Sequence, residues 1–287
     1  MLKPFRDRVL STYALMQTMI EKTAANATDL IKQRNKAKAE TIKEKTWPLS
    51  WSVDTAVFTN ITFKGYEQAV KPSEATGLQR MYYDHNKPYA KQLKFFNSFK
   101  PANFITTPKA YVIPQGWHAV IDILKLNNVL LKQFANDTMI EVEAYHIDDY
   151  RSSPRPYEKH HKNSAVKASV IKQQIKFLKG DYFIPMNQRA NRYIVEMLEP
   201  TGDDSFFAWN FFDAVLQQKE GYSDYRWEDL AAEVLKNNPA LKQKLEEKKA
   251  ADAKFAANSS AQLDFIYKNS PYYEPGHNRY PVYRLIQ

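Results

Sequence analysis

The side chains in this sequence that could hold a catalytic metal ion are six histidines and the carboxylates, because the chain contains no cysteine. A hydrolytic zinc site uses three such ligands and leaves one coordination position for the water that reacts. His146 and Asp149 lie three residues apart and His277 lies far downstream, which is the spacing of a ligand pair and a distant third. No histidine is followed three residues later by glutamate, so the chain offers no His-x-x-Glu ligand pair.

The sequence around His146 favours a structural role for this histidine. Apolar and polar residues alternate over 140–145, which indicates a half-exposed strand that ends at His146. We therefore predict no metal site and no catalytic residue in this chain, and keep His146, Asp149 and His277 as the alternative ligand set. His160 and His161 fall in a polar loop that is flanked by lysine, and we expect a solvated loop there.

Other chemistry has weaker support in the sequence. The chain has neither a Gly-x-Ser-x-Gly nucleophile motif nor a glycine-rich phosphate loop. The acid pairs Asp148-Asp149 and Asp203-Asp204 precede turns, where carboxylates usually cap the backbone. Asp204 or Ser205 is a candidate N-cap for a helix over 208–219.

The elements that would position these residues indicate an α+β fold. A periodic apolar face predicts one long helix, or two, over 5–45. Residues 50–66 are expected to form a hairpin around Thr59-Asn60, and prolines and glycines make 64–107 mostly loop. A strand at 110–113 leads into a helix that starts at Trp117 and ends at Asn127-Asn128. Residues 166–185 resemble a second hairpin. Helices are then predicted over 188–199, 208–219, 226–237, 239–249 and 258–268, followed by an extended tail.

This pattern divides the chain into three predicted regions. They are a long N-terminal helix over 1–48, a region with a mixed or antiparallel sheet over 49–185, and a mainly helical region over 186–287.

Charge and composition limit the partners that we expect. The net charge is +9, and residues 1–100 hold 17 Lys and Arg against 9 Asp and Glu, which is +8. We assign the lysines between 32 and 45 to the solvated side of a helix and expect no nucleic acid as a partner. No apolar run is as long as the about 18–20 residues that a membrane span requires. No signal-peptide pattern occurs at the N-terminus.

A dense aromatic stretch carries a family resemblance. Phe206, Phe207, Trp209, Phe211 and Phe212 follow a helix-like run over 187–200. Together with the segments 1–8, 109–115, 182–185, 270–274 and 279–281, this stretch resembles the C-terminal portion of bacterial zinc carboxypeptidase-like proteins, the carboxypeptidase A-type metallopeptidases. The resemblance covers nearly the whole chain. The spacing of rings 206, 209 and 212 itself predicts one helical side packed in a core.

The resemblance implies that the catalytic chemistry lies outside this chain. In such proteins the zinc-binding His-x-x-Glu, the second zinc-binding His and the catalytic Glu precede the segment that begins here at Met1. Met1 is then expected to be an internal methionine, as a truncated gene, a late start codon or a designed fragment would each produce. The missing catalytic domain is the expected partner, and zinc is the cofactor of the parent protein. The apolar stripe of the first helix should lack partners within the chain or be buried in a homodimer.

The expected function is accordingly a non-catalytic, scaffolding part of a zinc-dependent peptide hydrolase that is inactive alone. Export to the periplasm or medium would follow only if the parent protein carries a signal peptide. The alternative is a stand-alone module that binds peptide or glycan through tyrosine and tryptophan surfaces.

Overall fold

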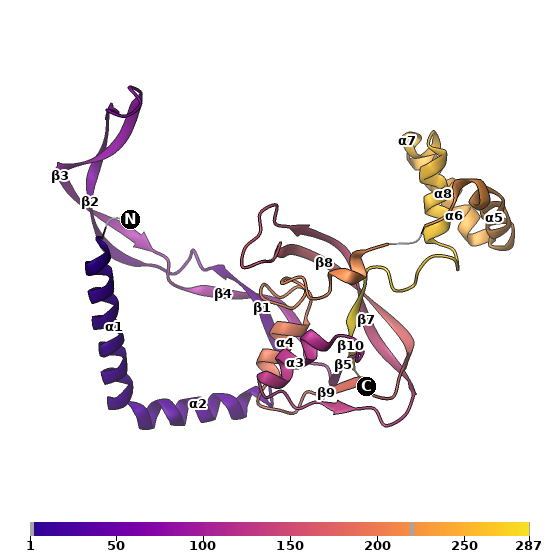
Figure 1. The fold of residues 1–287 in the computed structure, drawn as a ribbon, viewed down its shortest axis with the longest axis horizontal. Coiled ribbons are helices and arrows are strands. Elements are labelled where there is room, and N and C mark those ends of the chain that lie inside the picture. Colours follow the sequence, from indigo (N-terminus) through magenta and orange to yellow (C-terminus); the bar gives the residue numbers. More distant parts are fainter. Residues whose placement is uncertain (1–2, 219–220, 287) are drawn as a thin grey trace. The chain divides into compact units, whose positions relative to one another are not determined.

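The computed structural model describes residues 3–218 and 221–286, so Met1 and Leu2 of the family-like segment 1–8 lie outside the described residues. Helices and antiparallel sheets occur together, which confirms the α+β class (Figure 1). The chain divides into two compact units, one formed by residues 1–45 with 107–287 and the other by 46–106. The three regions expected over 1–48, 49–185 and 186–287 stay a prediction.

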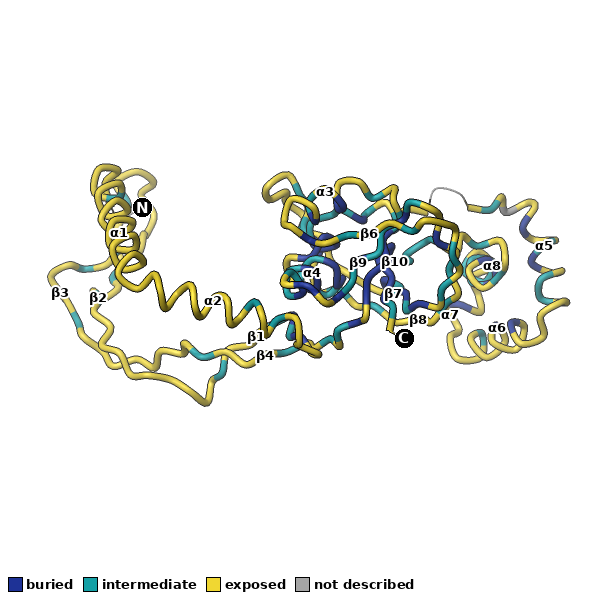
Figure 2. The backbone as a smooth tube through the Cα atoms, turned by 90° about the horizontal axis from the view of Figure 1, so that it is seen from below, coloured by how far each residue is buried: buried dark blue, intermediate teal, exposed yellow. Residues whose placement is uncertain are grey.

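Two successive helices form the N-terminal segment, α1 (Phe5–Ala25) and α2 (Ala27–Thr41). The helical geometry is interrupted at Asn26, where φ is −111° and the side-chain amide hydrogen-bonds back to the carbonyl of Lys22. Neither helix contains a buried residue, and Figure 2 shows both almost entirely in the exposed colour. The predicted helical segment is present in two parts, and its apolar side chains face solvent.

A six-stranded antiparallel sheet holds the main core. Its order is β6-β9-β5-β10-β7-β8. The strands are β5 (Ala110–Ile113), β6 (Lys132–Gln133), β7 (Thr138–Ser152), β8 (Asn163–Phe177), β9 (Tyr182–Pro185) and β10 (Arg279–Leu285). All four residues of β5 are buried, so both faces of the sheet are covered at this strand. Helix α3 (His118–Leu126) follows β5 as expected and ends before Asn128, whose positive φ of 58° is typical of a helix C-terminus.

The two faces of this sheet bury different groups. One face carries a purely hydrophobic cluster that includes Val112, Val142, Phe177 and Tyr283. On the other face, Tyr111 lies opposite Arg284 in the strand register, and Arg284 lies opposite Glu143. Tyr111 and Arg284 on this second face are buried, and Glu143 is half-buried.

The aromatic stretch packs differently from its prediction. Residues 201–212 form consecutive turns, followed by a 3₁₀ helix at Asp213–Leu216, so the helix expected over 208–218 is wrong; residue 219 lies outside the described residues. Phe206, Phe207 and Phe212 are buried, whereas Trp209 is only half-buried, so rings 206, 209 and 212 do not share one side. The ring of Phe212 packs edge-on against Tyr280 of β10, with 5.0 Å between centroids. The stretch covers the second face of the sheet.

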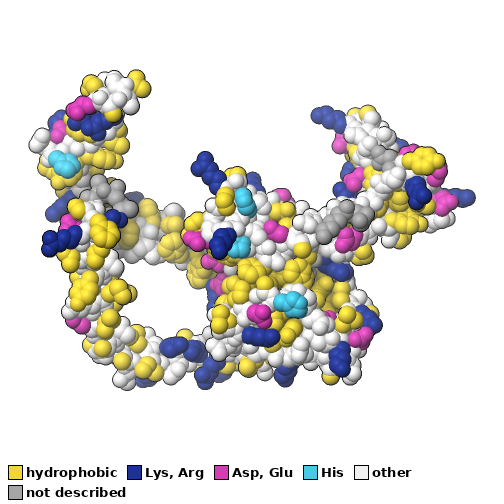
Figure 3. Space-filling view, in the orientation of Figure 1, with side chains coloured by type: hydrophobic (Ala, Val, Ile, Leu, Met, Phe, Trp, Pro, Cys, Tyr) yellow, Lys and Arg dark blue, Asp and Glu magenta, His cyan; other side chains and the backbone are white. Residues whose placement is uncertain are grey.

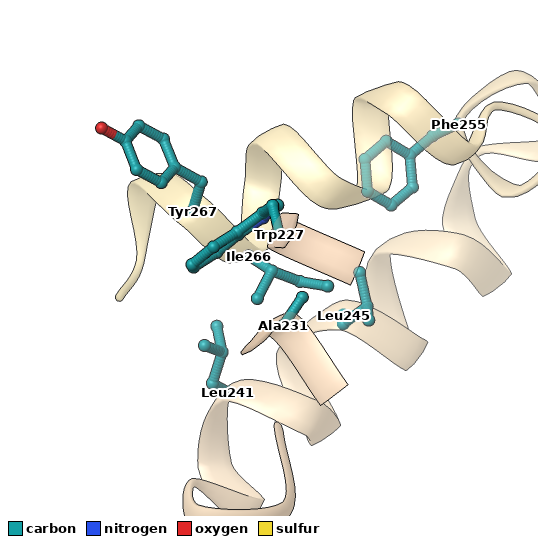
Figure 4. Close-up of a cluster of buried hydrophobic side chains, with 7 residues drawn as sticks. All are labelled: Trp227, Ala231, Leu241, Leu245, Phe255, Ile266 and Tyr267. Atoms are coloured by element: carbon teal, nitrogen blue, oxygen red, sulfur yellow. The ribbon is translucent and has the colours of Figure 1, made fainter. Parts of the chain in front are cut away.

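Five further helices follow among the described residues, and three of them begin at a side-chain cap. Helix α4 spans Asn191–Leu198, and the C-terminal helices are α5 (Asp224–Asn237), α6 (Pro239–Ala251), α7 (Ala253–Ala256) and α8 (Ser259–Lys268). Asn238, Asp252 and Asn258 accept backbone hydrogen bonds at the starts of α6, α7 and α8. Helices α5 to α8 share a small core around Trp227, whose seven buried side chains are drawn in Figure 4.

The unit formed by residues 46–106 consists of two antiparallel strand pairs. In one, β1 (Thr46–Val53) pairs with β4 (Phe99–Thr106); in the other, β2 (Thr59–Pro72) pairs with β3 (Gln79–Phe95). The hairpin expected at Thr59-Asn60 is wrong, because β1 pairs with a strand 46 or more residues away. The loop expected over 64–107 is also wrong. Pro72 ends β2, and Pro88 lies beside the irregularity at Tyr66 and Glu67, where strands tolerate proline.

The hairpin predicted over 166–185 is corrected as well. β8 pairs along its length with β7, and β9 pairs with β5 and β6. The two strands are thus separated by β5, β10 and β7 in the sheet, although only residues 178–181 separate them in the chain.

Candidate functional site

His146 lies near the end of the regular pairing of β7 and is held by a carboxylate. Its Nδ1 lies 2.9 Å from Oδ1 of Asp148, which also accepts a hydrogen bond from Ser169 on the neighbouring strand. His146 lines a pocket of about 140 Å³ together with His277, Glu274 and Arg279. The structure thus brings two residues of the alternative ligand set to one small pocket.

The third residue of that set, Asp149, does not line this pocket. Its carboxylate lies 3.0 Å from Nζ of Lys167, and this hydrogen bond lowers the pKa of Asp149 below its usual value. The ring of His277 is fully engaged, because Nε2 contacts the carbonyl of Leu216 and Nδ1 contacts the hydroxyl of Tyr273. A carbonyl oxygen can only accept, so Nε2 carries the proton and Nδ1 accepts. Neither nitrogen of His277 has a lone pair free for a metal ion.

Within residues 3–218 and 221–286, no three histidines or carboxylates are grouped closely enough to hold a metal ion. The same residues contain no helix with both the length and the apolar character that a membrane span requires.

In the acid pair Asp203-Asp204, Asp204 makes hydrogen bonds within and beside the aromatic stretch. Asp204 accepts hydrogen bonds from Nζ of Lys162 at 2.8 Å and from Nε1 of Trp209 at 3.2 Å. The bond from Lys162 lowers the pKa of Asp204. Ser205 Oγ accepts from the backbone N–H of Ala208, which is a cap-type bond within a turn. Asp204 and Ser205 therefore hold the local structure of the aromatic stretch.

A buried polar cluster was not predicted from the sequence. Glu199, just after α4, has no exposed surface, and Tyr111 of β5 donates a hydrogen bond of 2.5 Å to it. Nε of Arg284 lies 3.3 Å from the same carboxylate oxygen, and Nη1 of Arg284 donates to Glu143 at 2.9 Å. The guanidinium lies 5.6 Å from the ring centre of Tyr145. The members of this buried cluster come from positions 111, 143, 145, 199 and 284, so no local spacing in the sequence could have indicated the cluster.

The pKa values in this cluster are displaced by its burial. Burial raises the pKa of Glu199, and the nearby charge of Arg284 only partly opposes this. Burial, reinforced by Glu199, also raises the pKa of Tyr111 and Tyr145. Because Glu199 and Tyr111 are both fully buried, solutes have no access to them. We assign this cluster to the structure: it ties the end of α4 to strands β5, β7 and β10.

The polar loop predicted around His160 and His161 spans residues 153–162, between β7 and β8, and contains a tight turn beside Trp209. Tyr157 and His160 exchange two backbone hydrogen bonds, of 2.8 and 2.9 Å. The His160 ring stacks on Phe211 at 6.1 Å and meets Trp209 edge-on at 5.6 Å. Tyr157, with 64% of its surface exposed, lies 6.4 Å from Trp209 between ring centres. The side chains of Tyr157, His160, Trp209 and Phe211 come from two distant segments and form one surface, which we call the Tyr157 surface.

The turn that presents Tyr157 is conformationally strained. Its two central residues, Glu158 and Lys159, have positive φ angles of 50° and 71°. Two-residue turns of this kind favour asparagine and glycine, because a Cβ at positive φ costs about 1–2 kcal/mol per residue. Such strain persists where surrounding contacts hold it, and it is concentrated at binding sites. Here the packing of His160 against Phe211 and Trp209 supplies those contacts.

Comparisons of the chain with protein-family models, curated proteins and solved structures returned no match.

Proposed function

We propose that this chain is a non-catalytic, accessory and scaffolding part of a zinc-dependent carboxypeptidase-like peptide hydrolase. The proposal rests on the resemblance carried by the aromatic stretch and on one structural observation, the uncovered apolar stripe of α1. In the parent protein, zinc-bound water would attack the C-terminal peptide bond, with a glutamate as base. The residues of this chain would position that catalytic domain.

The apolar stripe of α1 supports the proposal because it needs a partner. Phe5, Val9, Tyr13, Met16 and Ile20 follow three- and four-residue steps and so share one side of the helix. Between 50% and 75% of each side chain is exposed. Figure 3 shows hydrophobic side chains reaching the surface along this helix. A continuous apolar stripe on a protein surface usually marks an interaction site.

Local helix stability does not account for this stripe. Helix α1 has no side-chain cap at its N-terminus, and most of the stability of a helix in a protein comes from the packing of its apolar face. Docking of the stripe onto an apolar surface would supply the missing stabilisation. The catalytic domain of the parent peptidase is the partner that the family resemblance implies, and a homodimer is the alternative.

A zinc titration of the purified chain tests the proposal, with the variants His146→Ala and Asp149→Ala as probes. We expect no stoichiometric zinc in any of the three proteins. Translation of the coding sequence upstream of the Met1 codon is expected to reveal His-x-x-Glu in frame. One zinc per chain that is lost in either variant would contradict the proposal, because the metal site would then be local.

The Tyr157 surface favours a second candidate function, a module that binds glycans or peptides. An exposed tyrosine beside a tryptophan offers ring faces for stacking. Against this candidate, Lys162 already lies over the Trp209 ring, 4.7 Å from its centre. Titration with cell-wall fragments tests it: saturable binding that is lost in Tyr157→Ala would favour the module, and no binding would dispose of it.

A further inference from the structure

The pocket beside His146, of about 140 Å³, has both apolar and charged side chains in its lining. Ala144 of β7 and Ile171 of β8 lie opposite each other in the strand register and supply the apolar part together with Pro275. A water molecule takes about 30 Å³, so the pocket has room for about five, and it is well below the roughly 300–1,000 Å³ of a site for a drug-sized ligand. The pocket therefore fits a molecule of a few non-hydrogen atoms.

The segment that leads into β10 is tied to the sheet at this pocket. The N–H of Ile147 in β7 donates a hydrogen bond of 2.8 Å to the carbonyl of Asn278. Arg279 lies opposite His146, and the register then shifts before the next paired residue of β10. Irregularities of this kind re-aim side chains and are common beside functional sites. All residues that line the pocket belong to one compact unit of the chain.

Two opposite charges line this pocket without forming an ion pair. Glu274 and Arg279 are five residues apart in the chain. Among the residues that the structure describes, neither pairs with the other or with a third charged residue, and no donor bonds the Glu274 carboxylate. Arg279 hydrogen-bonds with the hydroxyl of Tyr283, and a guanidinium has further N–H donors besides. A ligand with one negative and one positive group would meet an available partner for each.

The histidines beside these charges are held by hydrogen bonds. Both ring nitrogens of His277 are engaged, as described above. Asp148 accepts from His146 Nδ1 and from Ser169, so its carboxylate is shared between two donors. With Nδ1 donating, Nε2 of a neutral His146 ring is an acceptor. His146 thus offers a second acceptor, beside Glu274, for a cationic group in the pocket.

We propose that this pocket binds a free α-amino acid with a small apolar side chain. The ligand carboxylate binds the guanidinium of Arg279, whose planar fork matches carboxylate geometry. The ligand ammonium binds the carboxylate of Glu274, and the side chain lies against Ala144 and Ile171. A simple anion or cation fits less well, because it leaves one of the two charges without a partner. The inference goes beyond the proposed function and does not depend on it.

Calorimetric titration of the full-length chain with L-alanine tests this inference. We expect saturable binding of one L-alanine per chain. Glu274→Gln and Arg279→Gln each remove one charge and should each weaken binding about tenfold or more. Glu274 is exposed, so its variant is expected to fold, and circular dichroism checks the fold of Arg279→Gln. Glu228→Gln, at an exposed position in α5, is the matched control and should bind like the unaltered chain.

Two ligand analogues separate the two charge contacts. N-acetyl-L-alanine lacks the ammonium and L-alaninamide lacks the carboxylate, so each should bind about tenfold or more weakly than L-alanine. Absence of saturable L-alanine binding in the millimolar range would overturn the inference. Binding that Glu274→Gln and Arg279→Gln both retain would place the ligand elsewhere and also overturn it. Equal binding of N-acetyl-L-alanine would contradict the role of Glu274 and with it the recognition of an amino acid.

Discussion

Tyr111 and Glu199, 88 residues apart, are joined by a hydrogen bond of 2.5 Å and are both completely buried. Removal of the hydroxyl in Tyr111→Phe would leave the carboxylate without this donor in a site that water does not reach. We expect a loss of about 1–3 kcal/mol in the free energy of unfolding. Urea denaturation, monitored by near-ultraviolet circular dichroism, measures this loss.

Tyr193→Phe provides the matched control for that experiment. Tyr193 lies half-buried in α4, and its substitution is expected to change stability by less than about 0.5 kcal/mol. Equal effects of the two substitutions would show that the Tyr111–Glu199 bond contributes nothing specific.

The raised pKa of Glu199 predicts a pH dependence of stability. The folded chain keeps the Glu199 proton at pH values where the unfolded chain has released it. The contribution of Glu199 therefore falls as pH rises from the ordinary value of 4.5 to the raised value, and the loss is complete above it. Because Gln does not titrate, Glu199→Gln should gain stability relative to the unaltered chain over that interval.

Denaturation at a series of pH values gives the free energy of unfolding of Glu199→Gln minus that of the unaltered chain. The slope of this difference against pH does not depend on any constant cost of the substitution. Carboxylates with a lowered pKa, such as Asp204 beside Lys162, act in the opposite sense and lose their contribution as pH falls. A difference that shrinks as pH rises would mean that Glu199 is more acidic in the folded chain.

The aromatic stretch should stabilise the fold through its buried rings. Phe207 and Phe212 have no exposed surface and pack on Tyr280, so Phe207→Ala and Phe212→Ala should each cost about 3–5 kcal/mol. Trp209 is half-buried, and Trp209→Ala should cost clearly less. Thermal denaturation compares the three variants. An equal or larger loss for Trp209→Ala would contradict the packing described.

Gly202 allows the turn after α4 to approach the helix closely. A Cβ at this position would lie 2.8 Å from the backbone carbonyl oxygen of Glu196, and a backbone atom cannot move aside as a side chain can. We expect Gly202→Ala to cost about 1–3 kcal/mol. Gly221→Ala is the control, because a Cβ there meets nothing within 4 Å. Unchanged stability of Gly202→Ala in urea would show that the turn adjusts freely.

Local sequence patterns predicted the elements better than their partners. The helices at 226–237, 239–249 and 258–268 occur within two residues of the expected bounds, because their periodicity and caps are local. The pairing of β8 with β7 and of β9 with β5 depends on the tertiary fold, which the turn at Gly180 does not encode. Prolines led us to expect a loop over 64–107. Yet Pro72 ends β2, Pro88 lies beside an irregularity, and Pro101 lies in a two-stranded sheet, where each strand is an edge strand.

The same distinction holds for the candidate sites. His146 and His277 could be found because histidines are few, but the hydrogen bonds that occupy His277 come from Tyr273 and Leu216 and require the folded chain. Glu199 could not be recognised, since a glutamate before a proline usually lies at the surface at the end of a helix. The Tyr157 surface joins segments about 50 residues apart, and only the structure brings them together.

Hydrolysis of an N-blocked dipeptide with a free C-terminus, measured on the purified chain and on the polypeptide extended by the codons before Met1, tests whether the catalytic residues lie outside this chain. We expect no release of the C-terminal residue by the chain alone, and zinc-dependent release by the extended polypeptide. Zinc-dependent hydrolysis by the chain alone that is lost in His146→Ala would contradict it. An extended polypeptide without zinc or activity would also contradict it.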